Sequence, residues 1–214
     1  MKPLWPAVAR LTLAALILAA VAWTFAFAWA DLGKPPNPFN YFGYFTVQAN
    51  LLAMVVLAAV AVLSLTARRV PGWLHVARGC VTVYLVIVGI VYATLLAPLA
   101  EAGGVPVPWA NTVLHIITPL FLPLDWALVR DRPPLPWRAL PWVLAYPAVW
   151  LGVVLARGAS DGWVPYPFLD PGNGYGSVAV VCLAIFATGL ALGAVVWWAS
   201  HRLPSVPAAD GGTA

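Results

Sequence analysis

Residues 11–30 read LTLAALILAAVAWTFAFAWA, a nearly uninterrupted apolar run. A helix needs about 20 apolar residues to cross the hydrocarbon core of a bilayer, and this run has that length. Lys2 and Arg10 precede the run, and small residues at A-x-A spacing occur near its end, as in a secretory signal peptide. The apolar core of a signal peptide is only about 7–15 residues long, so the run predicts a first membrane-spanning helix.

The composition of the whole chain also indicates a membrane protein. The chain has 214 residues, of which 63% are hydrophobic and 8% are charged, and its mean hydropathy is +0.89. Soluble domains contain roughly 25% charged residues. The net charge of +4 does not indicate nucleic-acid binding, because the basic residues occur in short clusters between apolar runs. We therefore expect membrane lipids, and no nucleic acid, as partners.

Six apolar runs are long enough to span a membrane. They cover about residues 8–30, 42–66, 77–97, 109–129, 138–156 and 176–199. The segments between them are rich in Pro and Gly, which end helices. We expect an all-α bundle of six transmembrane helices that forms a single domain over residues 1–200. A short disordered tail is expected at 201–214.

The Lys and Arg residues predict the orientation of these helices. If the N-terminus is cytoplasmic, nine of these residues lie on the cytoplasmic side and only Lys34 and Arg157 lie on the other side. This asymmetry follows the positive-inside rule, and Trp residues near the span ends match the aromatic belts of membrane proteins. We expect a multipass protein of a bacterial cytoplasmic membrane, with both termini on the cytoplasmic side.

Two of the predicted helices carry polar residues at membrane depth. Thr46 and Asn50 share one face of the second helix, and Asn111, His115 and Asp125 share a face of the fourth. Polar groups that face hydrocarbon are costly, so both faces are expected to point into the bundle. At 1.5 Å per residue, Thr46 and His115 both lie about 9 Å into the membrane from the same side.

Thr46 and His115 suggest a nucleophile and its base. A threonine hydroxyl attacks an acyl carbon when a base takes its proton, and a neutral imidazole within about 2.6–3.2 Å can be that base. Asn50 or Asn111 would orient the imidazole or donate a hydrogen bond to an oxyanion. The same residues also fit a purely structural role, because polar side chains commonly tie membrane helices together.

Three further residues are candidates for the substrate-binding region. Tyr92 in the third helix reaches the level of the proposed nucleophile and base. Tyr166 and Asp170 belong to the loop at 157–175, on the same side of the membrane. We expect this loop either to lie in the membrane interface or to dip into the mouth of the bundle.

The remaining acidic and sulfur groups have other expected roles. Asp125 lies about 15 Å along the helix from the histidine, so the two cannot bind one metal ion, and we expect no metal and no cofactor. Asp125 is expected to pair with Arg130 or Arg132, or to reach the membrane interface. Cys80 and Cys182 lie at different depths, too far apart for a disulfide, and are expected to pack as small residues.

Three segments of the chain resemble those of a known family. YFTVQANLL at 44–52, NTVLHIITPLFLPLDW at 111–126 and YPFLDPGNGYGS at 166–177 are similar to bacterial six-span membrane proteins called Pr-six-Pr. That group resembles, at a distance, the eukaryotic androgen-induced-gene and androgen-dependent TFPI-regulating membrane proteins. The resemblance implies a threonine hydrolase that cleaves esters of fatty acids with hydroxy fatty acids. It also implies Thr46 as nucleophile and His115 as base, while Asn50 is displaced from the family's Asn position.

We therefore predict an intramembrane hydrolase of lipid-like fatty acyl esters that uses a Thr46–His115 dyad. Two other functions stay open from the sequence. One is a small transporter or channel, which Pro119 and Pro123 would suit by breaking the fourth helix. The other is a non-enzymatic membrane partner or assembly protein. A deep cavity that ends at Thr46 and His115 would favour the hydrolase, whereas a filled interior would favour the structural role.

Overall fold

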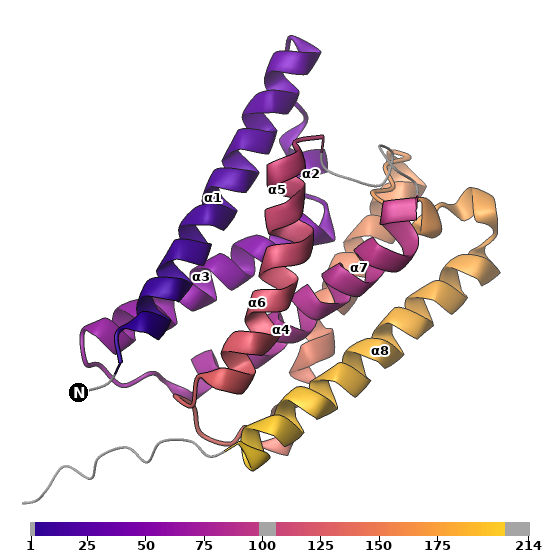
Figure 1. Cartoon of the computed structure of the whole chain (residues 1–214). Coiled ribbons are helices and arrows are strands. Elements are labelled where there is room, and N and C mark those ends of the chain that lie inside the picture. Colours follow the sequence, from indigo (N-terminus) through magenta and orange to yellow (C-terminus); the bar gives the residue numbers. More distant parts are fainter. Residues whose placement is uncertain (1–2, 99–105, 204–214) are drawn as a thin grey trace, which may run out of the picture.

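The computed structural model describes residues 3–98 and 106–203, and these residues form a bundle of helices without any strand (Figure 1). The all-α fold is confirmed, and several of its helices are suited to span a membrane. Helix α1 begins and α8 ends at the same end of the bundle, which we call the terminal end; the opposite end is the distal end.

Five helical segments are long and apolar enough to cross a membrane. They are α1 (Trp5–Leu32), α3 (Phe45–Leu65), α4 (Gly72–Val91) with the π-helical turn η1 (Tyr92–Leu96), α7 (Trp142–Ser160) preceded by η4 (Trp137–Ala139), and α8 (Tyr175–Arg202). The remaining predicted span, about 109–129, consists of α5 (Pro108–Thr112), the π-helical turn η3 (Val113–Ile117) and α6 (Thr118–Leu128). The short helices α2 (Pro38–Tyr41), η5 (Pro167–Leu169) and η6 (Pro171–Asn173) lie in the connections.

Two helix ends differ from the predicted boundaries. Helix α4 begins at Gly72, before the predicted start at 77, and the polar side chains of His75 and Arg78 are buried within it. The sequence pattern placed the polar His75 before the span, whereas Arg78 fell inside it, and ion pairing lets Arg78 lie within the bundle. Helix α8 continues to Arg202, so the predicted tail begins as helix. The rest of that predicted tail, 204–214, lies outside the described residues.

The π-helical turn η3 adjoins a proline. Pro119 has no backbone N–H, so the carbonyl of His115, four residues earlier, lacks its usual helical partner. The Thr118 hydroxyl donates to the carbonyl of Val113 at 2.9 Å, five residues back. On the neighbouring helix, a Cβ added to Gly89 would lie 2.9 Å from the Pro119 ring, so this glycine lets α4 approach the proline closely.

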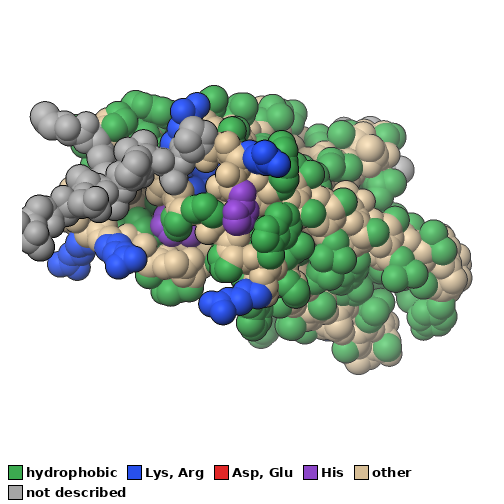
Figure 2. Space-filling view, turned by 90° about the horizontal axis from the view of Figure 1, so that it is seen from below, with side chains coloured by type: hydrophobic (Ala, Val, Ile, Leu, Met, Phe, Trp, Pro, Cys, Tyr) green, Lys and Arg blue, Asp and Glu red, His purple; other side chains and the backbone are tan. Residues whose placement is uncertain are grey.

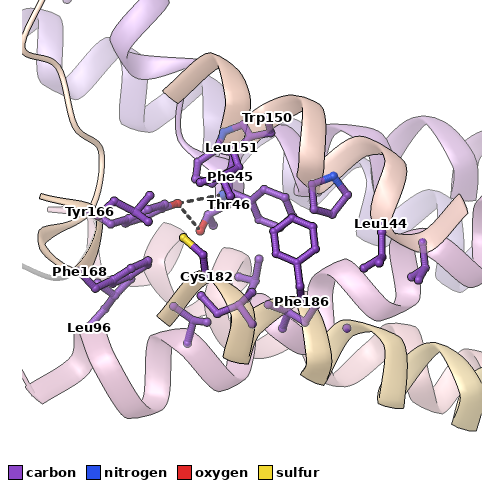
Figure 3. A pocket seen from close by; sticks show the side chains of 18 residues that line it. Phe45, Thr46, Leu96, Leu144, Trp150, Leu151, Tyr166, Phe168, Cys182 and Phe186 are labelled. Atoms are coloured by element: carbon purple, nitrogen blue, oxygen red, sulfur yellow. Dashed lines mark hydrogen bonds between the residues drawn. The ribbon is translucent and has the colours of Figure 1, made fainter. Parts of the chain in front are cut away.

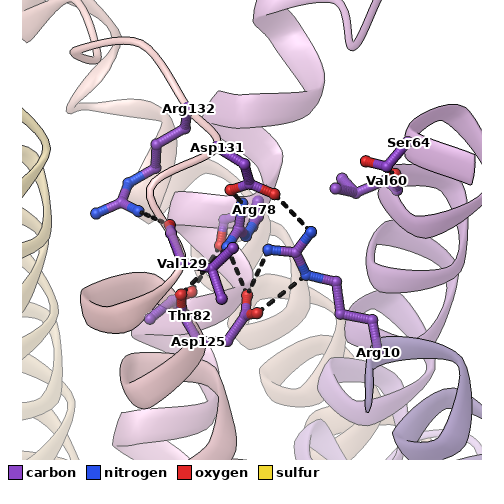
Figure 4. Close-up of polar contacts among 9 residues, drawn as sticks. All are labelled: Arg10, Val60, Ser64, Arg78, Thr82, Asp125, Val129, Asp131 and Arg132. Carbon is purple, nitrogen blue, oxygen red and sulfur yellow. Dashed lines mark hydrogen bonds and ion pairs between the residues drawn. The ribbon is translucent and has the colours of Figure 1, made fainter. Parts of the chain in front are cut away.

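A network of four charged side chains joins α1, α4 and α6 at the terminal end (Figure 4). Arg10 of α1 donates to Asp125 of α6 at 3.0 Å and to Asp131, which follows α6, at 2.6 Å. Arg78 of α4 donates to the same two carboxylates at 2.5 and 2.6 Å. Arg10, Arg78 and Asp125 are buried, whereas Asp131 closes the network from its partly exposed position.

The expected pairing of Asp125 with Arg130 or Arg132 is wrong. Arg132 stacks over the Trp126 ring at 4.0 Å and donates to the Val129 carbonyl at 2.8 Å, and Arg130 is exposed. The partners of Asp125 come instead from α1 and α4, because these helices pack against α6. Proximity along the chain suggested the nearest arginines, whereas helix packing brings distant arginines closer.

We predict that Asp125→Asn strongly destabilises the protein. The substitution leaves two buried arginines with too little negative charge, and breaking a buried ion pair from one side typically costs about 3–5 kcal/mol. Thermal unfolding in detergent should show a much lower midpoint for Asp125→Asn and an unchanged midpoint for Arg130→Gln, whose side chain is exposed. Equal midpoints for Asp125→Asn and the wild type would contradict a stabilising network.

The same network predicts sensitivity to acid. Burial opposes ionisation of Asp131, but Arg78 and Arg10 outweigh this effect and hold the pKa of this carboxyl below its ordinary value. Such a group stabilises the fold above its unfolded-state pKa, about 4, and loses this contribution as the pH falls further. The unfolding midpoint should decline below about pH 4, and decline less in Asp131→Asn. An equal decline in both proteins would show that Asp131 is not responsible.

Candidate functional site

An apolar cavity lies in the distal half of the bundle, between α3, α4, α7, α8 and the loop that carries η5 (Figure 3). Its volume is about 70 Å³, and its walls are almost entirely hydrocarbon. Among its lining residues, only Thr46 and Tyr166 carry hydroxyl groups. The cavity therefore combines an apolar interior with one small polar spot.

Thr46 and Tyr166 meet at this polar spot. Thr46 lies in the first turn of α3, where backbone N–H groups have no acceptor within the helix. The Tyr166 hydroxyl accepts a hydrogen bond from the Thr46 N–H at 3.3 Å and lies 3.5 Å from Thr46 Oγ1 (Figure 3). Tyr166 thus caps α3 and holds its ring beside the threonine hydroxyl.

The Tyr166 phenol is suited to donate a hydrogen bond and not to act as a base. Burial raises the pKa of Tyr166 to about 12, although its hydrogen bonds with Thr46 oppose this shift. The phenol therefore stays protonated at neutral pH. Because its oxygen already accepts from the backbone of Thr46, its own O–H is available for Oγ1 of Thr46 or for a bound molecule.

His115 lies in the middle of η3 and is buried. Its Nδ1 is 3.3 Å from the carbonyl oxygen of Asn111, which suits an Nδ1–H tautomer with a free electron pair on Nε2. The imidazole stacks on Tyr92, with ring centroids 4.3 Å apart, and Asn111 Nδ2 donates to the Tyr92 hydroxyl at 2.7 Å. Three predicted site residues thus form one group, in which Tyr92 and His115 lie in the π-helical turns η1 and η3 and Asn111 lies in α5. Such turns are frequent at functional sites.

Thr46 and His115 belong to neighbouring groups. His115 does not line the cavity, and no hydrogen bond joins it to Thr46 among the residues that the structure describes. The two groups are bridged by Asn50, whose Nδ2 donates to the Thr46 carbonyl at 2.9 Å and to the Leu114 carbonyl at 3.2 Å. One amide nitrogen thus contacts the backbone at Thr46 and the residue next to His115, so both lie at the same level.

The other end of the Asn50 amide has no partner. Its Oδ1 is buried and accepts no hydrogen bond in the described structure. A buried acceptor without a donor costs about 1–3 kcal/mol, and such groups in native proteins often mark a place for water or for a functional contact. Asn50 is therefore both a structural bridge and a free acceptor between the two groups.

Asp170 does not contribute to the cavity. Its side chain is exposed, and its Oδ1 accepts a hydrogen bond from the Gly172 N–H at 2.8 Å. This contact shapes the turn that leads into η6, so Asp170 acts on the loop and not on a substrate in the cavity. Both cysteines are free, and Cys182 lines the cavity near Thr46 and Tyr166 (Figure 3).

Most of the cavity lining could not be recognised in the sequence. Trp150 and Leu151 of α7 and Phe186 of α8 line it, but their only signal is apolar character, which lipid-facing residues share. Trp150 also borders a second cavity of about 410 Å³, whose polar side chains are Gln48 and Arg157. The Trp150 indole donates to the Gly43 carbonyl at 2.8 Å, which fixes it as a wall between the two cavities.

Comparisons with protein-family models, with curated proteins and with solved structures found no match. Within residues 3–98 and 106–203, no three His, Cys, Asp or Glu side chains are grouped closely enough to hold a metal ion. The chemical argument therefore depends on the geometry of Thr46, Tyr166, Asn50 and His115.

We predict that Tyr166→Phe lowers the stability by about 0.5–2 kcal/mol, because it removes the hydroxyl that caps α3. The change retains the ring, which stacks on Phe168 with centroids 5.2 Å apart. Thermal unfolding should show a small decrease in the midpoint for Tyr166→Phe and none for Tyr175→Phe, whose side chain is 72% exposed. A midpoint unchanged by Tyr166→Phe would mean that this hydroxyl is not a stabilising cap.

Proposed function

We propose that the protein is a membrane enzyme that hydrolyses lipid-like fatty acyl esters with Thr46 as its nucleophile. The observation that carries this proposal is the position of the Thr46 hydroxyl, at the wall of an apolar cavity and 3.5 Å from the protonated Tyr166 phenol. Apolar pockets with a few placed polar groups are typical of sites for apolar ligands. An acyl chain would occupy the cavity, and its ester carbonyl would meet the two hydroxyls.

The membrane is proposed to be a bacterial cytoplasmic membrane, with the terminal end on the cytoplasmic side. Figure 2 views the terminal end, where side chains in the colour of Lys and Arg and two in the colour of His are visible, and no Asp or Glu side chain is seen in the described part of that face. At the distal end, Arg157 pairs with Asp161 at 2.7 Å. The excess of basic residues at the terminal end supports this orientation by the positive-inside rule.

In the proposed reaction, His115 acts as a general base through one water molecule that the free Asn50 Oδ1 helps to hold. The Thr46 hydroxyl gives up its proton, which passes through the water to Nε2 of His115. Thr46 Oγ1 forms a bond to the ester carbonyl carbon, and the carbonyl oxygen becomes an oxyanion. The O–H of Tyr166 donates a hydrogen bond to this oxyanion.

Collapse of the tetrahedral intermediate breaks the bond to the alcohol, which leaves with the proton from His115. The acyl group remains on Thr46 as an ester. A second water molecule then gives a proton to His115 and attacks that ester. Its collapse releases the fatty acid and returns the proton to Thr46 Oγ1, so one ester and one water yield one acid and one alcohol.

We predict that a lipophilic fluorophosphonate probe, which reacts with activated hydroxyls, labels the wild type at Thr46. Thr46→Ala should lose the label, and His115→Ala should react at least about 100-fold more slowly, because general-base assistance contributes about 10²–10⁴-fold. The control is Thr24→Ala, since Thr24 is also buried but its hydroxyl donates to the Ala20 carbonyl at 2.8 Å within α1. Thr24→Ala should label like the wild type.

Unfolding midpoints measured beside the labelling would show that each variant is folded. Labelling that survives Thr46→Ala would exclude Thr46 as the nucleophile, and the transporter and structural roles would then be favoured. Loss of label in Thr46→Ala with full labelling in His115→Ala would retain the nucleophile and exclude His115 as its base.

A further inference from the structure

We infer that the acyl chain enters the cavity sideways from the bilayer, through a seam between α7 and α8. The substrate class is then an ester-containing lipid dissolved in the membrane, and not a water-soluble ester. This inference rests on the proposed function and deepens it. The seam consists of cavity-lining residues from the two helices: Leu144, Pro147, Leu151, Cys182, Ile185 and Phe186.

The exposure of the lining residues shows which side of the cavity is open. Its floor is formed by α3 and α4, where Thr46, Ile87 and Val88 are buried. All six seam residues are partly exposed. At the distal end the loop closes over the cavity with the buried side chains of Tyr166 and Leu169. Phe45, Val91 and Phe168 are also partly exposed, but the seam is the one continuous row of partly exposed lining residues shared by two helices.

The packing of α7 and α8 allows the seam to widen. Only 11% and 17% of their most apolar stretches are buried, against 56% for α4, so these two helices are the peripheral ones. Near the terminal end they pack tightly, because a Cβ added to Gly193 of α8 would lie 3.3 Å from Val143 of α7. Toward the distal end the same pair of helices borders the cavity. Pro147 also removes one backbone hydrogen bond from α7, which eases bending there.

The size of the cavity requires such widening. Its volume of about 70 Å³ is small, whereas pockets that enclose a small ligand usually measure about 300–1,000 Å³. The lined part of α8, from Cys182 to Gly189, extends about 10 Å along the helix at 1.5 Å per residue. A narrow slot of this length suits a linear chain. Parting the seam exposes apolar side chains to lipid tails, which are equally apolar, so it costs little.

Photo-crosslinking in vesicles tests whether an acyl chain enters the cavity from the bilayer, which we call the lateral route. The experiment does not require the protein to hydrolyse an ester. The protein is placed in phosphatidylcholine vesicles that contain a phosphatidylcholine with a diazirine at the end of one acyl chain. After irradiation, mass spectrometry locates the crosslinks. We expect crosslinks on the buried floor residues Ile87 and Val88, and none on Val56 and Val113, which have the same exposed fractions of 8% and 4% but line no cavity. Leu183, which is 70% exposed, reports the general lipid contact.

A matched pair of variants then assigns the route to the seam. Ile185→Trp fills the seam and should reduce floor crosslinking at least fivefold, whereas Val180→Trp, at a residue that is 67% exposed on the same helix, should leave it unchanged. Crosslinking of Leu183 should be the same in all proteins. Absence of floor crosslinks in the wild type, or floor crosslinks that persist in Ile185→Trp, would overturn the lateral route. If the wild type gives the floor crosslinks but its Thr46 does not react with the fluorophosphonate probe, the lateral route stands and only the proposed hydrolase is refuted.

Discussion

The ion-pair network of Arg10, Arg78, Asp125 and Asp131 is the constraint on which the arrangement of the helices depends. In lipid, apolar side chains do not drive one helix against another as they do in water, so packing and polar contacts decide which faces meet. Two arginines that share two carboxylates leave little freedom for α1, α4 and α6 to rotate or slide. Releasing any one member would leave a buried charge, which makes other arrangements much less favourable.

Helix α4 and the helical segment from α5 to α6 extend from this network into the distal half, so the network also fixes the position of their distal residues. These are the elements that bring Tyr92 and His115 into their stack, at 4.3 Å. Asn50 then joins α3 to the same segment, which places Thr46 beside it. The site is therefore built on the well-packed half of the bundle, while the weakly buried α7 and α8 form the side of the cavity that can yield.

The all-α fold, the approximate ends of most apolar helices and the inward position of Thr46, Asn50 and His115 follow from the cost of polar groups in hydrocarbon, which a sequence displays directly. The partners of these residues do not follow from it. Tyr166 lies 120 residues from Thr46, in a loop whose aromatic residues equally fit a membrane interface. The pairing of Asp125 with Arg130 or Arg132 was predicted wrongly for the same reason. The rotation of each helix about its axis decides which side chains meet, and it depends on contacts between distant segments. The π-helical turns also escape detection, since they change local register without a distinctive composition.

The site combines strong and weak contacts in a way that bears on how it works. The contacts that support the polar residues are short, such as the 2.7 Å bond from Asn111 to Tyr92 and the 2.9 Å bond from Asn50 to the Thr46 carbonyl. The contact between the two hydroxyls in the cavity is long, 3.5 Å, and therefore weak. A carbonyl oxygen that enters the cavity can replace Thr46 Oγ1 as the acceptor of the hydrogen bond from the Tyr166 O–H, and the loss of the weak contact costs little free energy. The backbone bond at 3.3 Å keeps the tyrosine in place meanwhile. The Tyr166 hydroxyl is thus kept beside α3 by the backbone bond while its bond to Thr46 Oγ1 can be exchanged, which is the arrangement that the proposed stabilisation of an oxyanion would use.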